Sequence, residues 1–166
     1  MAYANKTYVC FDADNDMRWY NLMKAWKEHE HIAFDFHNAH EINNLRDGSS
    51  EATIKAKLRE RLKNTKVLVV LIGEKTANLY KYVRWEIEYA LENDIPIIGV
   101  NLNMNKYQDD LCPPILKPDL AIYISFGQKI MNHALNHWPA SHVAHKRDGK
   151  TGPFYYLDSV YKSLGL

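Results

Sequence analysis

The stretch KVLVVLIG at residues 66–73 decides the fold class. Every residue from Val67 to Ile72 is apolar, without alternation between apolar and polar positions, so other parts of the protein must cover both faces of the strand. Strands buried on both faces are typical of parallel sheets that carry helices on either side. The stretch therefore predicts the central strand of a parallel sheet.

Shorter segments on both sides of this stretch complete a regular pattern. Apolar runs predict four more strands, at residues 7–12, 32–36, 95–103 and 120–126. Apolar residues at helical spacing predict helices at residues 16–31, 51–64, 79–94 and 127–138, and the segment at residues 155–165 closes the chain. The alternation predicts an α/β fold, a flavodoxin-like three-layer sandwich whose five-stranded parallel sheet has the order 2-1-3-4-5.

Length and composition are those of an ordinary globular domain. The chain has 166 residues, of which 46% are hydrophobic and 25% charged, and this predicts one domain spanning residues 1–166. We expect its core at about residues 6–135 and an extension at residues 136–166. The first part of that extension, residues 136–154, has an irregular pattern.

Charge and hydropathy argue against several classes of partner. The net charge of +1 supplies no long-range attraction for nucleic acid or for an anionic membrane. No apolar run reaches the roughly 20 residues of a membrane span, and the first residues do not show a signal-peptide pattern. Cys10 and Cys112 stand alone in different contexts. We therefore expect reduced thiols and a cytoplasmic protein that binds neither nucleic acid nor membrane.

The predicted topology indicates where a ligand would bind. In open parallel sheets, ligands bind outside the carboxyl ends of the strands, near the point where the strand order reverses. The residues expected at this rim are Phe11, Asp12, Asp14, 36–41, 73–76, Asn101 and Asn103. Glu86 follows the third strand by about a dozen residues, in the first turns of a helix whose N-terminus should face the same rim.

Glu86 lies beside the apolar stripe of its helix. The stripe consists of Val83, Ile87, Ala90 and Leu91. On a helical wheel Glu86 falls about 85° from the centre of the stripe, a boundary position that could face a cleft. Trp85 falls nearly opposite the stripe, and an exposed Trp indicates an interface. Acids near helix N-termini also complement the helix dipole, so helix physics leaves both a surface acid and a working acid open.

Other catalytic motifs find little support. Acids after the first strand are typical of receiver domains, but the third strand ends in VLIGE, without the Asp that accepts the phosphoryl group. His133, His137, His142 and His145 lack an accompanying Cys or H-E-x-x-H pattern, so we expect surface histidines and no metal site. The sequence also has no Walker A loop, no G-x-G-x-x-G and no G-x-S-x-G elbow.

Against this background, YVRWEIEYAL at residues 82–91 resembles the catalytic-helix motif of TIR domains, in which a Glu follows an aromatic residue by four positions. More specifically, the chain is similar to the TIR-like family of the Thoeris anti-phage sensor subunits. In that family an FDF- or FDA-type strand, a polar loop, a VLIG strand, a WVRYEI-type helix and an IIGI/V strand occur in this order. A terminal FYSLSSVY-type segment also recurs there, and PFYYLDSVYKSL at residues 153–164 matches it. The resemblance covers most of residues 6–104 and this C-terminal segment.

The resemblance implies an enzyme that breaks the nicotinamide–ribose bond of NAD⁺, with NAD⁺ as substrate and no cofactor. Cleavage develops positive charge on the ribose, which the motif Glu would stabilise. In the Thoeris-like branch the ADP-ribose is commonly captured as a cyclic isomer, a soluble messenger for a separate effector. Self-association into TIR assemblies and a phage-derived trigger are further expectations.

Carried over position by position, the resemblance makes Glu86 the catalytic acid and gives Tyr82 the aromatic position, where its ring can stack on a base or on nicotinamide. Phe11 and Asp12 would lie beside the ribose. Asn38 and His40 belong to residues 37–44, which correspond to the mobile loop that closes over substrate. Because an acid repels a pyrophosphate, Asp12 is expected to meet a hydroxyl group, whereas many catalytic TIR domains have a basic residue or Ser near this point.

Two other functions stay open at this stage. One is a non-enzymatic TIR-like interaction module, with Trp85 and residues 37–50 as its assembly surfaces. The other is a small nucleotide-binding protein with flavodoxin topology, which would carry a yellow flavin. Glu86→Gln separates the enzyme from the interaction module, because only the enzyme depends on that carboxyl group.

Overall fold

The computed structural model describes residues 6–30, 35–37, 50–79 and 81–166 of the chain. Its centre is a sheet in the order β2-β1-β3-β4-β5-β6, in which every neighbouring pair of strands is parallel. The strands are β1 (Lys6–Cys10), β2 (Asp35–His37), β3 (Val67–Ile72), β4 (Ile97–Asn101), β5 (Ala121–Ser125) and β6 (Pro153–Tyr155). The predicted α/β fold and the predicted order of its first five strands are confirmed.

β3 is an interior strand of this sheet, and all of its residues are buried. Successive side chains of a strand point to opposite faces of the sheet, so β3 contributes to two separate cores. The two sets are Val67, Val69 and Leu71 on one face and Leu68, Val70 and Ile72 on the other. The uninterrupted apolar run therefore reflects two cores that share one strand.

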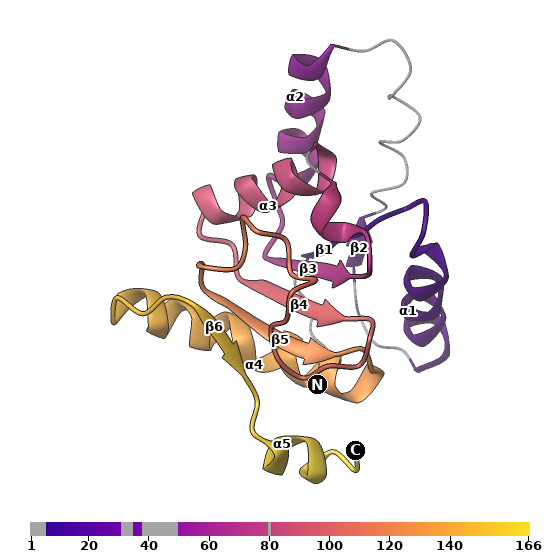
Figure 1. The fold of residues 1–166 in the computed structure, drawn as a ribbon, viewed down its shortest axis with the longest axis vertical. Coiled ribbons are helices and arrows are strands. Elements are labelled where there is room, and N and C mark those ends of the chain that lie inside the picture. The colour runs from indigo at the N-terminus through magenta and orange to yellow at the C-terminus, as the bar shows by residue number, and fades with distance from the viewer. Residues whose placement is uncertain (1–5, 31–34, 38–49, 80) are drawn as a thin grey trace.

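Helices cover both faces of the sheet (Figure 1). The helices are α1 (Met17–Glu30), α2 (Glu51–Leu62), α3 (Tyr82–Glu92), α4 (Gln128–Arg147) and α5 (Asp158–Ser163), with a short 3-10 helix, η2 (Thr76–Asn78), before α3. α1, α4 and α5 pack on the face that carries Val69, whereas α3 packs on the face that carries Val70. α2 lies beside α3, where Ile54 and Leu58 contact the α3 aromatics Tyr82 and Trp85.

β6 is a sixth strand that the sequence pattern did not predict. It pairs with β5 from Ala121↔Pro153 to Tyr123↔Tyr155, at the end of the sheet. Three residues are too few to show alternation, and Pro153 argues against a strand in the interior of a sheet. At an edge the missing N–H of a proline is tolerated. The closing segment at residues 155–165, for which no element was predicted, contains the end of β6 and the short helix α5 (Asp158–Ser163).

The expectation of an irregular stretch at residues 136–154 is wrong for its larger part, because α4 continues to Arg147. Pro139 lies inside it, and a proline usually ends or kinks a helix because it lacks an N–H and crowds the preceding turn. The buried stripe nevertheless runs on from Ile130 to Trp138 and His142, so packing against the sheet offsets the local cost. The expected division at residue 136 falls within this helix. Among the described residues, no helix is long and apolar enough to cross a membrane.

Gly99 of β4 tests how closely the α3 face is packed. A Cβ atom at this position would lie 2.6 Å from the ring of Tyr123 and 3.2 Å from Ile72. We predict that Gly99→Ala lowers the free energy of unfolding by about 1–3 kcal/mol, the usual cost of overpacking. Denaturant unfolding measures it.

The matched control is Gly127→Ala. A Cβ at residue 127 would meet its nearest neighbour, Ile130, at 3.5 Å, an ordinary contact. Equal stability of the two variants would show that β4 and β5 can separate at no cost, which is contrary to this account of the core.

Candidate functional site

Glu86 lies in the second turn of α3, and its side chain is only 4% exposed. Its Oε1 accepts a hydrogen bond of 3.0 Å from the hydroxyl of Tyr8, which belongs to β1. Val83 and Ile87 flank it on α3 and pack in the core that also contains Tyr8. Glu86 therefore places a carboxyl group inside the layer between α3 and the sheet.

Two titratable side chains reach this layer from β1. Tyr8 and Cys10 are fully buried, and the Cys10 thiol lies 3.9 Å from the carbonyl oxygen of Val83, to which it donates. Burial raises the pKa of Tyr8, and the negative charge of Glu86 raises it further. The same causes raise the pKa of Cys10 well above its usual value. Both groups therefore stay protonated and neutral beside Glu86.

The expectation that Glu86 occupies an open boundary position is wrong. Val83, Ile87 and Ala90 face the sheet as predicted, while Tyr82 and Trp85 face α2. On the helical wheel Glu86 falls between these two directions, at about 100° per residue. A wheel drawn for one helix contains no information about a second helix packed beside it, so the burial of this flank was not predicted.

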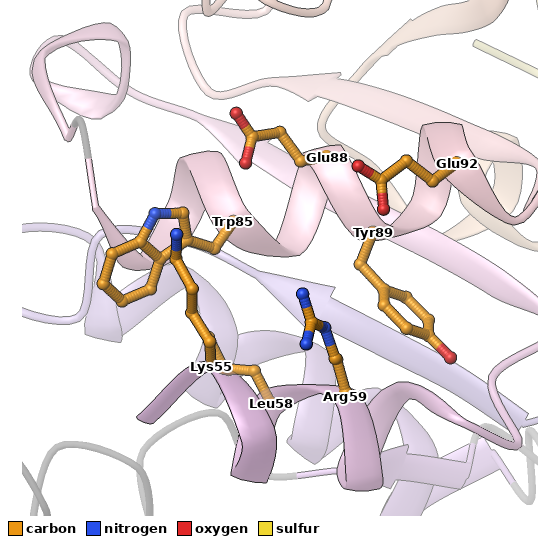
Figure 2. A pocket seen from close by; sticks show the side chains of 7 residues that line it. All are labelled: Lys55, Leu58, Arg59, Trp85, Glu88, Tyr89 and Glu92. Carbon is orange, nitrogen blue, oxygen red and sulfur yellow. The ribbon is translucent and has the colours of Figure 1, made fainter. Parts of the chain in front are cut away.

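Trp85 is likewise not the exposed residue that was expected. Figure 2 shows its ring turned toward α2, where the Lys55 ammonium lies 4.7 Å from the ring centroid. Tyr82 meets the same ring edge-on, with 5.5 Å between centroids. The groove between the helices has a volume of about 60 Å³ and is lined by Lys55, Leu58, Arg59, Trp85, Glu88, Tyr89 and Glu92. Trp85 therefore serves a helix–helix contact within the chain.

Phe11 and Asp12 follow β1, and both side chains are already engaged. The Phe11 ring stacks on Tyr20 of α1 with centroids 4.8 Å apart, in the core on the α1 face of the sheet. Asp12 Oδ1 accepts from the backbone N–H groups of Asp14 and Asn15, at 3.1 and 3.3 Å. Its Oδ2 accepts from Asn15 Nδ2 at 2.6 Å. These contacts shape the turn into α1, and substrate contacts of either residue stay predictions.

Asn38 and His40 lie outside the described residues. The strand before them, β2, pairs with β1 as far as Tyr8↔His37. The chain therefore leaves β2 beside Tyr8, the partner of Glu86. The position of the expected substrate loop beyond His37, and the roles of Asn38 and His40, stay predictions.

A cleft of about 350 Å³ opens where the chain leaves β1, β3 and β4, at the predicted rim. Its lining residues are Asn15, Asp16, Arg18, Trp19, Gly73, Glu74, Lys75, Leu102, Asn103 and Leu111. Asp16 is buried in the wall, and its Oδ2 has no hydrogen-bond partner among the described residues. Burial raises the pKa of Asp16, and the charge of Asp12 adds to the effect. A Cβ at residue 73 would collide with the Asp16 carboxyl group, which explains why β3 is followed by Gly73.

Tyr8 and Asp16 were not predicted as residues of the site. Strand alternation was an available signal for Tyr8, because it places Tyr8 and Cys10 on one face of β1. The pairing of that face with Glu86, 78 residues later, depends on where α3 crosses the sheet. The closeness of Asp16 to Gly73 arises from the packing of two loops, which no local sequence pattern predicts.

The histidines of α4 differ from one another in exposure. The rings of His133 and His137 contact each other in a tilted arrangement with centroids 4.3 Å apart, while His142 is buried next to Trp138. The expectation of surface histidines is therefore wrong for His142, which continues the core stripe of α4. In the part of the chain that the structure describes, no group of three or more His, Cys, Asp or Glu side chains is placed to hold a metal ion.

Asp12→Ala tests the structural role of the first turn. The variant loses the acceptors of three hydrogen bonds at a buried site, so we predict a loss of about 1–2 kcal/mol in the free energy of unfolding. Thermal and denaturant unfolding measure it. Asp14→Ala, two residues along the same turn and exposed, is the matched control with a smaller expected loss. An Asp12 variant as stable as the wild type would show that the turn does not need this carboxylate.

A comparison with protein families agrees with this arrangement. A family model described as "Thoeris protein ThsB, TIR-like domain" matches residues 8–107, more than half of the chain. The match starts inside β1 and ends just beyond β4, so it includes both Tyr8 and Glu86. The TIR-like resemblance seen in the sequence is thereby confirmed. The chain belongs to the defence-related, TIR-like family of the Thoeris protein ThsB.

Proposed function

We propose that this protein cleaves NAD⁺ between nicotinamide and ribose and converts the ADP-ribose part into a cyclic or conjugated messenger for a separate effector in anti-phage defence. Family membership supports the proposal, as does the position of Glu86 in the YVRWEIEYAL motif. The observation that carries it is the burial of Glu86 and its 3.0 Å hydrogen bond to Tyr8. The effect of a helix dipole on an acid falls off within the first turn, whereas Glu86 lies in the second turn of α3.

Cleavage of the nicotinamide–ribose bond requires from the protein mainly a negative charge placed close to the ribose. The C1′–N bond breaks and its electron pair leaves with nicotinamide, which departs as a neutral molecule because its ring is a cation in NAD⁺. The positive charge passes to the ribose as an oxocarbenium ion, and the ionised Glu86 would stabilise it. A nucleophile then attacks C1′ and loses a proton. Water would yield ADP-ribose, whereas a group within the ADP-ribose would yield a cyclic product.

Substrate contacts other than Glu86 are assigned by resemblance to the family. Tyr82 begins α3, one turn before Glu86, and we propose that its ring meets the base or the nicotinamide. Asn38 and His40 lie outside the described residues, and their contact with substrate is proposed from the resemblance alone. Phe11 and Asp12 would border the ribose through the turn that they shape.

The burial of Glu86 bears on when the protein would be active. With 4% of its side chain exposed, substrate can reach Glu86 only after groups around it move. We therefore expect NAD⁺ cleavage in the cytoplasm to follow an activating event, either self-association into TIR assemblies or a phage-derived trigger. Assays accordingly belong in infected cells and in concentrated protein solutions.

Glu86→Gln is the decisive substitution for this proposal. The amide has nearly the same shape and keeps an acceptor for Tyr8, but it carries no charge, so we predict that NAD⁺ turnover falls by about 10²–10³-fold while the fold is kept. Mass spectrometry of NAD⁺, nicotinamide and ADP-ribose products in phage-infected cells measures the effect.

Glu88→Gln is the control on the same helix. Glu88 is partly exposed and pairs with Arg84 at 2.9 Å on the helix surface. Such a pair contributes only about 0.3–0.5 kcal/mol, so this variant should keep its turnover.

Full turnover by Glu86→Gln would refute the proposal. Phage protection that survives this substitution, with NAD⁺ levels unchanged in the wild type, would instead identify a non-enzymatic interaction module. Trp85→Ala is a poor probe for that alternative, because Trp85 packs against α2 and its removal would lower stability.

A further inference from the structure

Tyr8 carries a hydroxyl group into the core between α3 and the sheet. Its side chain has no exposed surface, and the described residues that form a core cluster with it are hydrophobic. Taking a hydroxyl group out of water is costly unless it finds a hydrogen-bond partner, and here that partner is Glu86 Oε1. A Phe would fill the same space without this requirement. The hydroxyl group is therefore connected with Glu86 and not with packing alone.

We infer that Tyr8 is a positioning residue for Glu86: its hydroxyl anchors Oε1 in one orientation and favours the ionised form of the side chain. The inference rests on the proposed function, in which the ionised Glu86 stabilises the ribose cation. Tyr8 acts through Glu86 and does not itself contact substrate.

The backbone around Tyr8 suits an anchor. β1 lies inside the sheet, paired with β2 on one side and β3 on the other. A Tyr side chain on such a strand has only two torsions, so its hydroxyl group has a defined position. A Glu side chain has one torsion more, so a hydrogen bond from a fixed donor restricts the rotamers that it can adopt. Electrostatic stabilisation of a transition state requires that the charge be in place beforehand.

The surroundings keep Tyr8 in the donor form. The titratable groups near the pair in the described chain are Cys10 on β1 and Arg61 on α2, and His37 of β2 is the register partner of Tyr8. Arg61 lowers the pKa of Tyr8, but burial and the charge of Glu86 raise it by more. The pKa of Cys10 is raised as well, so its thiol adds no charge. The phenol therefore remains a donor throughout the pH range of an assay.

The test is the pH profile of NAD⁺ cleavage by the activated protein. Tyr8→Phe removes the hydroxyl group alone. A carboxylate that loses a donor is less favourable in its ionised form, so the acidic limb of the kcat profile should move to higher pH by about one to two units. kcat at neutral pH should fall, while KM should change less than about twofold because Tyr8 does not touch substrate.

Tyr123→Phe is the matched control for stability. Tyr123 is also fully buried in the α3-side core, and its hydroxyl group contacts Gln108 and Cys112. Its loss should weaken the fold to a similar extent without moving the pH profile. An acidic limb that coincides in the wild type and Tyr8→Phe, or that moves equally in Tyr123→Phe, would overturn the inference.

A second measurement does not depend on enzymatic activity. Carbon-13 NMR of protein labelled at glutamate carboxyl carbons follows the titration of Glu86, with Glu86→Gln identifying the signal. In Tyr8→Phe this titration should move to higher pH by the same one to two units, about the effect of a hydrogen bond to a charged group. If the Glu86 titration shifts in Tyr8→Phe but the wild-type protein cleaves no NAD⁺, the proposed function is refuted while the coupling between Tyr8 and Glu86 stands. If the Glu86 titration does not shift in Tyr8→Phe but the wild-type protein cleaves NAD⁺, the inference about Tyr8 is refuted while the proposed function stands.

Discussion

The arrangement of this protein depends on one constraint, which is that β3 must bury apolar side chains on both of its faces. Each buried aliphatic side chain contributes about 1.5–3 kcal/mol, so neither face can be left open to water. Helices α1 and α4 meet the requirement on one side, and α3 meets it on the other. Because α3 lies on the face toward which Tyr8 points, its polar residue Glu86 is carried to the surface of β1.

A carboxyl group in that layer is expensive unless the protein supplies a donor. Tyr8 supplies one at 3.0 Å from the interior of a paired strand, and Cys10 lies close by as a neutral thiol. A fold selected for stability alone would place an apolar side chain at residue 86, because well-packed apolar side chains usually stabilise a protein core at least as much as buried polar groups do. Folding stability alone therefore does not account for a carboxyl group at residue 86.

The fold was predictable from the sequence to a greater extent than the site. The run at residues 66–73 predicts β3 because double burial leaves a pattern within one segment. β6 and the second half of α4 could not be predicted in the same way, because a three-residue strand has no period and Pro139 opposes a helix until the sheet beneath it is known. Local patterns thus identify the elements whose packing is strong and regular.

The sequence singled out Glu86, whose catalytic role stays a prediction, but it did not predict the surroundings of this side chain. Its motif is visible in the sequence, whereas the burial of its flank and of Trp85 depends on α2 packing beside α3. The Tyr8 contact joins residues that are far apart in the chain, and no spacing rule connects them. Asp16 became part of the rim cleft for the same reason, through a loop contact with Gly73.

The most direct test of the account is a double-mutant cycle in the free energy of unfolding at neutral pH. The cycle compares the wild type, Tyr8→Phe, Glu86→Leu and the double variant. We predict that Tyr8→Phe costs more in the wild-type background than in the Glu86→Leu background, by about 1.5–3 kcal/mol, because only in the wild type does it remove a hydrogen bond to a buried carboxylate. Equal costs in the two backgrounds would show that the two side chains are not coupled and would contradict the account.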